Sequence, residues 1–207
     1  MGCCIVVGAG TFDTPIRKPR SGDLVIAADG GLTYLAQSGV AADVVVGDFD
    51  SLGSRPNHEN VLELPKEKDD TDLLFALKYG LGRGYKEFHI YGGTGGRMDH
   101  TLANLQCLLY LAERGARGFL HGGGQTYTCV KNDSIEFDPG HAGTVSVFAW
   151  GGCAEGVALE GLSYPLSDAR LTPDYPLGVS NFFTGQKSKI AVKNGALLVT
   201  YPIRFSN

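Results

Sequence analysis

Short apolar runs alternate with segments of helical periodicity through the first 120 residues of the chain. The runs are rich in aliphatic and β-branched residues and are mostly followed by Gly or Asp, which predicts strands at Cys3–Val7, Leu24–Ala28, Val44–Val46, Phe88–Tyr91 and Gly118–Leu120. Apolar residues recur at helical spacing between these runs, which predicts helices at Leu32–Gly39, Asp72–Tyr79 and Thr101–Arg114. Strands that alternate with helices are typical of a mainly parallel sheet, so we expect an α/β domain at residues 1–124.

From about residue 122 the chain changes to short β-rich runs separated by turn residues, without helical periodicity. Asn194-Gly195 separates the last two runs, and Asn-Gly between β-rich runs is a strong hairpin signal, so we expect a hairpin there. We therefore expect a second, all-β domain at residues 125–207, either a small sandwich or a barrel. Its predicted strands are Thr126–Val130, Ser134–Phe137, Thr144–Trp150, Val157–Glu160, Lys189–Val192 and Ala196–Tyr201.

The composition is that of a soluble globular protein, since 43% of the 207 residues are hydrophobic and 19% are charged. The 22 acidic residues outnumber the 18 basic ones, and the formal net charge of −4 argues against a nucleic-acid-binding surface. The apolar run Cys3–Val7 is too short for a signal peptide or a membrane span, and Val6 stands where a myristoylation motif needs Ser or Thr. The five cysteines form no C-x-x-C pair, which is typical of a reducing compartment, so we expect a cytoplasmic protein without a membrane or nucleic-acid partner.

Acidic and glycine residues gather in four segments where predicted strands end or predicted helices begin. Ligands of open α/β sheets bind beyond the carboxyl ends of the strands, so we expect these segments at one shared edge. The segments are Ala27-Ala28-Asp29-Gly30-Gly31, Gly47-Asp48-Phe49-Asp50-Ser51, Lys68-Asp69-Asp70-Thr71-Asp72 and Gly92-Gly93-Thr94-Gly95-Gly96-Arg97-Met98-Asp99-His100.

Asp48 and Asp50 are two residues apart, so in an extended chain their carboxylates point to the same side. Carboxylates this close repel each other unless a cation lies between them. Hard oxygen ligands of this kind suit Mg²⁺ that is also bound to substrate phosphates. Together with Asp72 they predict a Mg²⁺ site, with the alternative that each Asp only caps a turn or a helix.

The segment Gly92–Gly96 predicts an anion site, because a glycine backbone can approach a ligand closely and this one leads into a helix. Arg97 adds a fork of donors suited to phosphate oxygens. Asp99 would repel a phosphate, and its role stays open between a helix cap, a metal ligand or base, and both. His100 is expected to be packed or hydrogen-bonded rather than catalytic.

The familiar nucleotide-binding motifs are missing or incomplete. A G-x-x-x-x-G-K-[ST] segment is absent, which excludes a P-loop enzyme. Gly8-Ala9-Gly10 follows a predicted strand, but Asp13 replaces the third glycine of G-x-G-x-x-G, although Asp29 lies at the distance of a ribose-binding acid. A nicotinamide-dependent oxidoreductase is therefore one alternative, and a nucleotide-sensing or carbohydrate-binding module without catalysis is another.

The four acidic and glycine-rich segments, in this order, resemble those of the thiamine pyrophosphokinase family. Leu102 and Asn104 extend the last segment, and the second half is similar through Gly161–Leu166 and Gly178–Asn181, so the resemblance spans nearly the whole chain. Residues Pro173–Leu177 depart from the family, because the small polar residues expected there are missing. This departure concerns the shape of the thiamine pocket rather than the reaction.

The resemblance implies a homodimer in which each chain has an α/β catalytic domain followed by a β-sandwich. The active site would lie between the α/β domain of one subunit and the β domain of the other. The enzyme would transfer the pyrophosphoryl group of ATP to the hydroxyethyl group of thiamine, with Mg²⁺, and release AMP.

The resemblance also implies roles for individual residues. Mg²⁺ would be held by Asp48, Asp50 and Asp72. ATP would be bound by Asp29, Gly30, Gly93, Thr94, Gly95, Gly96 and Arg97. Catalysis would fall to Asp72, Arg97 and Asp99, and thiamine would contact Asp99, Ser180 and Asn181.

Aromatic side chains are further candidates for thiamine contact, because thiamine is permanently cationic and an acidic, partly aromatic pocket suits it. The candidates are Trp150, Tyr164 and Tyr175, with packing in the core or in hairpins as the alternative. The residues leave the nucleotide open between ATP, GTP and others.

Overall fold

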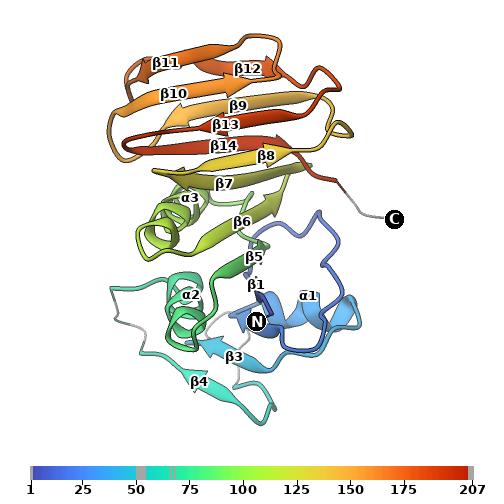
Figure 1. Ribbon diagram of the computed structural model, residues 1–207. Helices are drawn as coiled ribbons and strands as arrows, with labels where there is room; N and C mark the ends of the chain where they lie inside the picture. The colour runs from blue at the N-terminus through green and yellow to red at the C-terminus, as the bar shows by residue number, and fades with distance from the viewer. Residues whose placement is uncertain (1, 50–54, 66, 68, 205–207) are drawn as a thin grey trace. The chain divides into compact units, whose positions relative to one another are not determined.

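The computed structural model of the chain describes residues 2–49, 55–65, 67 and 69–204. Its elements form two compact units (Figure 1). The first unit comprises the residues up to 107 together with 115–124, and the second comprises 108–114 together with the residues from 125 onward. No helix in the described part of the chain is long and apolar enough to span a membrane.

Within the described residues, six parallel strands form the sheet of the first unit, in the order β6-β5-β1-β2-β3-β4. The strands are β1 (Cys4–Val7), β2 (Leu24–Ala28), β3 (Val44–Gly47), β4 (Val61–Glu63), β5 (Glu87–Tyr91) and β6 (Arg117–Gly122). The helices are α1 (Gly31–Gln37), α2 (Asp72–Gly82) and α3 (Met98–Ala112). The expected α/β architecture is confirmed, and the short edge strand β4 is the element that the apolar pattern missed.

Strand β1 lies at the centre of this sheet, and Ile5 and Val6 on it are inaccessible to solvent. Strands β2, β3 and β4 follow on one side of β1, whereas β5 and β6 lie on the other side. The point at which strand order reverses is where open α/β sheets bind ligands, beyond the carboxyl ends of the strands. The fold therefore directs attention to the segments that follow β1, β2, β3 and β5.

Helix α2 is held by a side-chain cap at its start and by a close contact with β5 near its end. The Thr71 hydroxyl caps it by accepting a hydrogen bond from the Leu74 N–H at 3.2 Å. Near the other end, a Cβ at Gly80 would lie 2.7 Å from the Phe88 ring, so only glycine lets the helix approach β5 this closely. The first residue of the helix, Asp72, is thereby held in place.

The described strands of the second unit form two antiparallel sheets of four strands each, in the orders β12-β9-β14-β7 and β11-β10-β13-β8. Residues of both sheets, including Val147, Val199, Leu159 and Ile190, pack in one hydrophobic cluster. The second unit is therefore a β-sandwich. Its strands are β7 (Gln125–Lys131), β8 (Ser134–Phe137), β9 (Thr144–Ala149), β10 (Ala154–Glu160), β11 (Leu166–Leu171), β12 (Gly178–Phe182), β13 (Ser188–Ala191) and β14 (Ala196–Pro202).

The hairpin expected at Asn194-Gly195 is wrong. Strands β13 and β14, which flank these residues, belong to different sheets of the sandwich. The Gly195 N–H donates to Asn132 Oδ1 at 2.9 Å, and the Asn132 N–H donates to the Gly195 carbonyl at 3.1 Å. Asn132 lies in another connection that passes from one sheet to the other, between β7 and β8, so the turn residues here join two such connections instead of closing a hairpin.

Strands β11 and β12 were not predicted from the sequence. The residues of β12 alternate poorly between buried and exposed, because Val179, Ser180 and Phe182 are all exposed. The pairing of β11 with β10 is interrupted by shifts in register. A strand without a regular two-residue burial period gives no periodic signal in sequence.

Candidate functional site

A cavity of about 860 Å³ opens in the first unit, at the edge of the parallel sheet where the strands end. Its walls are formed by the segments that follow β1, β2, β3 and β5, together with residues of α1, α2 and α3. Of the residues predicted from the sequence, the structure brings together in this cavity Asp29, Asp48, Asp72, Gly93, Gly95, Gly96 and Arg97.

Three aspartates reach the cavity from three different elements. Asp29 follows β2 in a left-handed conformation (φ +49°), and its N–H donates to the Val46 carbonyl at 2.8 Å. Asp48 follows β3, and Asp72 is the first residue of α2. The convergence of these carboxylates depends on strands that are adjacent in space, so no local pattern of residues could show it alone.

Phe49 anchors the segment that carries Asp48. Its side chain is only 4% exposed and packs in the core cluster that also contains Leu35 and Val45. Its backbone has a positive φ of +58°, which is unfavourable for an aromatic residue and persists only where the surroundings hold it. The buried ring therefore fixes the direction in which the chain turns after β3.

The donor set of the cavity fits Mg²⁺. Carboxylate oxygens of Asp29, Asp48 and Asp72 are hard ligands, and Mg²⁺ usually binds to one or two carboxylates plus phosphate oxygens. Arg97 is the one Arg or Lys side chain among the described residues that line the cavity. The predicted ligand Asp50 lies outside the described residues.

Residues Gly8–Thr11, which we call the strap, run alongside the glycine-rich loop that follows β5. The Gly10 N–H donates to the Gly92 carbonyl at 2.7 Å, and the Thr11 N–H donates to the Thr94 carbonyl at 2.8 Å. All four strap residues line the cavity. The strap and the loop therefore form one hydrogen-bonded wall.

Glycine is required where the strap meets the loop. A Cβ at Gly10 would lie 2.7 Å from the Gly92 carbonyl oxygen and 2.8 Å from that of Thr94. Gly92 itself has a φ of +60°, and a Cβ there would lie 2.4 Å from the Gly8 carbonyl oxygen. The sequence showed Gly8 and Gly10 only as part of an incomplete dinucleotide motif, although their position after the first strand was the available signal.

Asn104 on α3 supports the loop from the other side. The residue is 7% exposed, and its side-chain amide donates from Nδ2 to the Gly93 carbonyl at 2.8 Å. Thr94 lies in the predicted ATP-binding loop, but its side chain is buried toward Gly122 and is not part of the cavity wall. Gly30 is likewise outside the wall and serves as the N-cap residue of α1.

Arg97 and Asp99 form an exposed, two-pronged ion pair at the start of α3. Arg97 Nη2 donates to Asp99 Oδ2 at 2.6 Å, and Arg97 Nε donates to Asp99 Oδ1 at 3.2 Å. The hydrogen bonds from Arg97 lower the pKa of the Asp99 carboxyl, and the same contacts raise the pKa of Arg97. Asp99 is therefore a carboxylate at neutral pH, and it lies beside the cavity rather than in its wall.

Ser180 and Asn181 lie on β12 in the second unit, and they differ in exposure. Ser180 is exposed and has a φ of +59°, whereas Asn181 is 3% exposed. Asn181 Oδ1 accepts hydrogen bonds from the Tyr164 and Phe182 N–H groups, both at 2.9 Å, and Asn181 Nδ2 donates to the Tyr164 carbonyl at 2.7 Å. Asn181 thus positions the backbone of the segment that carries Tyr164.

The three aromatic candidates also differ in exposure. Tyr164 and Tyr175 are each 65% exposed, whereas Trp150 is half-buried. Leu177 and Phe182, on or near β12, are exposed as well. The structure therefore presents exposed aromatic and apolar side chains near Ser180. None of these side chains lines the cavity of the first unit.

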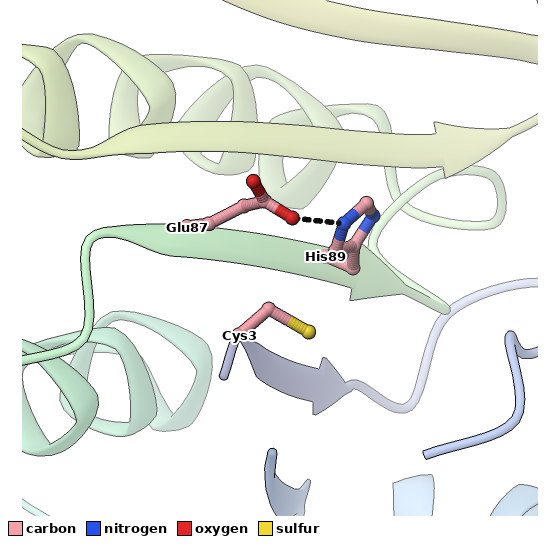
Figure 2. A group of neighbouring side chains, drawn as sticks. All are labelled: Cys3, Glu87 and His89. Atoms are coloured by element: carbon pink, nitrogen blue, oxygen red, sulfur yellow. Dashed lines mark hydrogen bonds and ion pairs between the residues drawn. The ribbon is translucent and has the colours of Figure 1, made fainter. Parts of the chain in front are cut away.

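A second cluster of reactive residue types lies on the same sheet and outside the cavity wall. Figure 2 shows Glu87 and His89 on β5 and Cys3 directly before β1, with a hydrogen bond of 3.1 Å between His89 Nε2 and Glu87 Oε1. The other ring nitrogen of His89 lies 3.0 Å from His121 Nε2. The guanidinium of Arg17 donates to Cys3 Sγ at 3.1 Å, so it supplies the positive charge of the cluster and we assign the group a structural role.

Burial keeps the thiol and the two imidazoles of this cluster uncharged. Desolvation raises the pKa of the Cys3 thiol to about 11. It lowers the pKa of His121 to about 3 and also lowers that of His89. The thiol and both imidazoles are therefore neutral at pH 7.

Two family models match successive parts of the chain. The model described as thiamin pyrophosphokinase, catalytic domain, matches residues 19–120. The model described as thiamin pyrophosphokinase, vitamin B1 binding domain, matches residues 133–197. The residues that line the cavity fall largely within the first match, and Ser180 and Asn181 fall within the second.

Individual relatives agree with the family models. Thiamine pyrophosphokinase of Bacillus subtilis is 28% identical over 191 residues, which cover 85% of this chain and 86% of that protein. A crystal structure of the Bacillus subtilis enzyme superposes with a TM-score of 0.87 at 22% identity, covering 98% of this chain and 100% of that one. A thiamin pyrophosphokinase family protein from Enterococcus faecalis superposes with a TM-score of 0.79 at 25% identity, covering 98% and 100%.

The alternatives of an oxidoreductase and of a binding module without catalysis are set aside by these matches. Together the two models cover most of the chain and follow each other in the same order as the two units. The chain belongs to the thiamine pyrophosphokinase family of enzymes.

Proposed function

We propose that this protein transfers the pyrophosphoryl group of ATP to the hydroxyethyl group of thiamine in a Mg²⁺-dependent reaction that releases AMP. The observation that carries the proposal is the convergence of three aspartates, a glycine-rich loop and Arg97 on one cavity. Phosphoryl-type transfer needs alignment and neutralisation of charge more than covalent help, and these are the groups that supply both.

The aspartates have the role of metal ligands in this proposal. Asp48 and Asp72 would hold Mg²⁺, with Asp50 as the further ligand and Asp29 close by. Bound Mg²⁺ would offset the negative charge of the triphosphate. Without a cation, the three carboxylates of the cavity would repel ATP.

The glycine-rich loop and Arg97 would bind the phosphates. Gly95 and Gly96 have positive φ values of +76° and +60°, and both are exposed at the cavity. A Cβ at Gly96 would meet open space, so a phosphate can approach the backbone N–H groups there. The Arg97 guanidinium offers further donors to the phosphate oxygens.

Asp99 would orient the thiamine alcohol. The alcohol oxygen attacks the β-phosphorus, the bond from that phosphorus to the oxygen of the α-phosphate breaks, and AMP leaves. A carboxylate with a lowered pKa is a weak base, so Asp99 accepts a hydrogen bond from the hydroxyl and takes its proton late in the step. When phosphate oxygens accept hydrogen bonds from Arg97, the ion pair between Arg97 and Asp99 would weaken, and Asp99 would become more basic.

Thiamine would be bound by the second unit. Ser180 offers an exposed hydroxyl, and Asn181 holds the Tyr164 segment in place. The match of the vitamin B1 binding model to residues 133–197 supports this assignment. The homodimer implied by the resemblance is part of the proposal, and light scattering of the purified protein tests it.

The reaction is tested by incubating the protein with ATP, Mg²⁺ and thiamine and separating the products. We expect AMP and thiamine diphosphate in equal amounts, and neither product when EDTA removes the divalent cation. Turnover that persists in EDTA would contradict the metal assignment.

Substitution of one carboxylate tests the site directly. We expect Asp48→Asn, which keeps the size and removes the charge, to lower turnover by at least about 100-fold. Asp138→Asn, at an exposed position in the second unit, serves as the matched control and is expected to keep wild-type turnover. Unfolding curves of both variants should remain close to that of the wild type, and near-normal turnover of Asp48→Asn would remove Asp48 from the site.

A further inference from the structure

Asp13 is the residue of the incomplete dinucleotide motif that the proposed reaction leaves without a role. It stands where G-x-G-x-x-G has its third glycine, two residues beyond the strap, and it does not line the cavity. In a dinucleotide-binding fold this glycine lets a helix pack closely against the strand. The described residues between β1 and β2 form no helix, so that reason for a glycine does not apply to this chain.

Both oxygens of the Asp13 carboxylate accept hydrogen bonds. Oδ2 accepts from the Gly123 N–H at 2.9 Å, and Oδ1 accepts from the Thr14 hydroxyl at 3.0 Å. Because Thr14 is only 4% exposed, its side chain is held by packing and orients the carboxylate. Gly123 lies 110 positions further along the chain, in the turn directly after β6. The carboxylate therefore joins two distant segments of the first unit.

The glycine-rich loop lies between these two segments. At the end of β6, a Cβ at Gly122 would collide with the Thr94 hydroxyl, so β6 and the loop are in close contact. On the strap side, the Thr11 N–H donates to the Thr94 carbonyl at 2.8 Å, and a Cβ at Gly95 would collide with the Thr11 hydroxyl. Thr94 and Gly95 are therefore enclosed between the strap and the end of β6.

These contacts form a closed ring around the loop. The strap contacts the loop through Thr11, the loop contacts the end of β6 through Thr94, and Asp13 completes the ring by binding Gly123. Asp13 makes its link with an exposed side chain outside the cavity wall. It can therefore be replaced without removing a contact to the ligand or a residue of the core.

We propose that Asp13 is a positioning residue that holds the glycine-rich loop, through the strap and the turn after β6, in the conformation that binds phosphates. This inference rests on the proposed function, because that function assigns the phosphates of ATP to Gly95 and Gly96. Asp13 acts on the ligand only through the loop.

The hydrogen bonds of Asp13, rather than its charge, carry this role. The Gly123 N–H and the Thr14 hydroxyl are both neutral donors. An asparagine can replace the carboxylate here, because its oxygen can accept from Gly123 and its amide nitrogen can donate to the Thr14 oxygen. An alanine removes both bonds.

The second unit offers a matched hydrogen bond for comparison. There the Gly195 N–H donates to Asn132 Oδ1 at 2.9 Å, so an exposed side chain again accepts from a glycine that is distant in sequence. Asn132→Gly removes this acceptor and suits the φ of +48° at that position. It is therefore the control for the loss of one such bond away from the cavity.

The test measures binding of ATP and of inorganic tripolyphosphate, both with Mg²⁺ and without thiamine, by isothermal titration calorimetry. We expect Asp13→Ala to bind both ligands about fivefold more weakly, because they share the polyphosphate that the loop contacts. Asp13→Asn and Asn132→Gly should bind both ligands like the wild type. In turnover assays, Asp13→Ala should raise the KM for ATP and leave that for thiamine unchanged.

Hydrogen–deuterium exchange without ligand tests the same role independently of any reaction. In Asp13→Ala, peptides covering residues 92–97 should exchange faster than in the wild type, because the ring around the loop is open. In Asp13→Asn and Asn132→Gly, these peptides should exchange at the wild-type rate.

Several outcomes would overturn the positioning role. They are wild-type affinity for both ligands in Asp13→Ala, wild-type exchange of the loop in that variant, an equal loss of affinity in Asp13→Asn or Asn132→Gly, and a wild type that binds neither ligand. If thiamine diphosphate is not formed but Asp13→Ala loosens the loop and weakens tripolyphosphate binding, the proposed reaction fails and the role of Asp13 stands.

Discussion

Burial decides the charge of individual side chains in the cluster around His89 and His121. Both imidazoles have lowered pKa values because they are desolvated, whereas the exposed Asp99 has a lowered pKa because Arg97 donates to it. The same direction of shift thus has opposite consequences. The histidines lose their charge at neutral pH, and the aspartate keeps it.

The buried histidines make stability depend on pH. His121 has a pKa of about 3 in the folded protein and an ordinary value near 6.5 when unfolded, so below about pH 6.5 only the unfolded chain takes up the proton. Stability is therefore highest above this pH and falls by about 1.4 kcal/mol per pH unit toward pH 3. Between pH 6.5 and 5.0 we expect His121 to account for a loss of about 2 kcal/mol, measured by denaturant unfolding.

Substitution of His121 checks this origin. His121→Phe should show a smaller loss of stability over the same pH interval than the wild type, because a titrating group is gone. His100→Gln, at an exposed position, should keep the wild-type dependence. Parallel curves for wild type and His121→Phe would mean that His121 protonates freely in the folded state.

At the scale of elements, sequence patterns predicted those parts whose signal is local. Strands β2 and β8 have the bounds expected from their apolar runs, and α2 begins at the expected Asp72. Strand β12, which carries Ser180 and Asn181, was missed because its exposed residues break the two-residue period. The hairpin at Asn194-Gly195 failed because the same turn residues serve a crossing between sheets, and which of the two occurs depends on distant strands.

The contact between the strap and the glycine-rich loop can be tested by adding one methyl group. In Gly10→Ala the new Cβ would lie 2.7 and 2.8 Å from two backbone carbonyl oxygens, so one of the segments must move. We expect a loss of stability of about 1–3 kcal/mol and a raised KM for ATP.

The matched glycine is Gly82, at the end of α2. A Cβ there would meet no atom within 4 Å, so Gly82→Ala should leave the KM for ATP unchanged and increase stability by about 0.4–1 kcal/mol. A Gly10→Ala protein with wild-type stability and KM would show that the strap is not held as closely as the structure describes.

At the scale of the whole molecule, each unit has its own hydrophobic core, around Ile5 and Val45 in the first and around Val147 and Ile190 in the second. The rule that ligands bind beyond the carboxyl ends of parallel strands predicted that the segments of Asp29, Asp48 and Asp72 share one edge, whereas the order of the neighbouring strands came only from the structure. The buried side of Thr94 could not be foreseen, since it depends on a contact with Gly122, far along the chain. Asn104 was noted as an extension of the glycine-rich segment, but its hydrogen bond to the Gly93 carbonyl came only from the structure.

The division into units predicts where each substrate protects the backbone. In hydrogen–deuterium exchange, ATP with Mg²⁺ should slow exchange in peptides covering residues 8–12 and 92–97, because the first unit contains the cavity. Thiamine should slow exchange in peptides covering residues 163–164 and 178–182 of the second unit. Protection by ATP that is confined to the second unit would contradict the assignment of the nucleotide to the first.

Phe49 shows that a substitution in the buried core beneath such a site can impair the site without changing any group that contacts metal or substrate. The residue offers no group to metal or substrate in the proposed reaction, yet its buried ring and left-handed backbone hold the chain next to Asp48. An inactivating replacement of Phe49 would therefore be mistaken for the loss of a reactive group. Conversely, cautious repacking around this ring offers a way to retune metal affinity while every ligand atom stays unchanged.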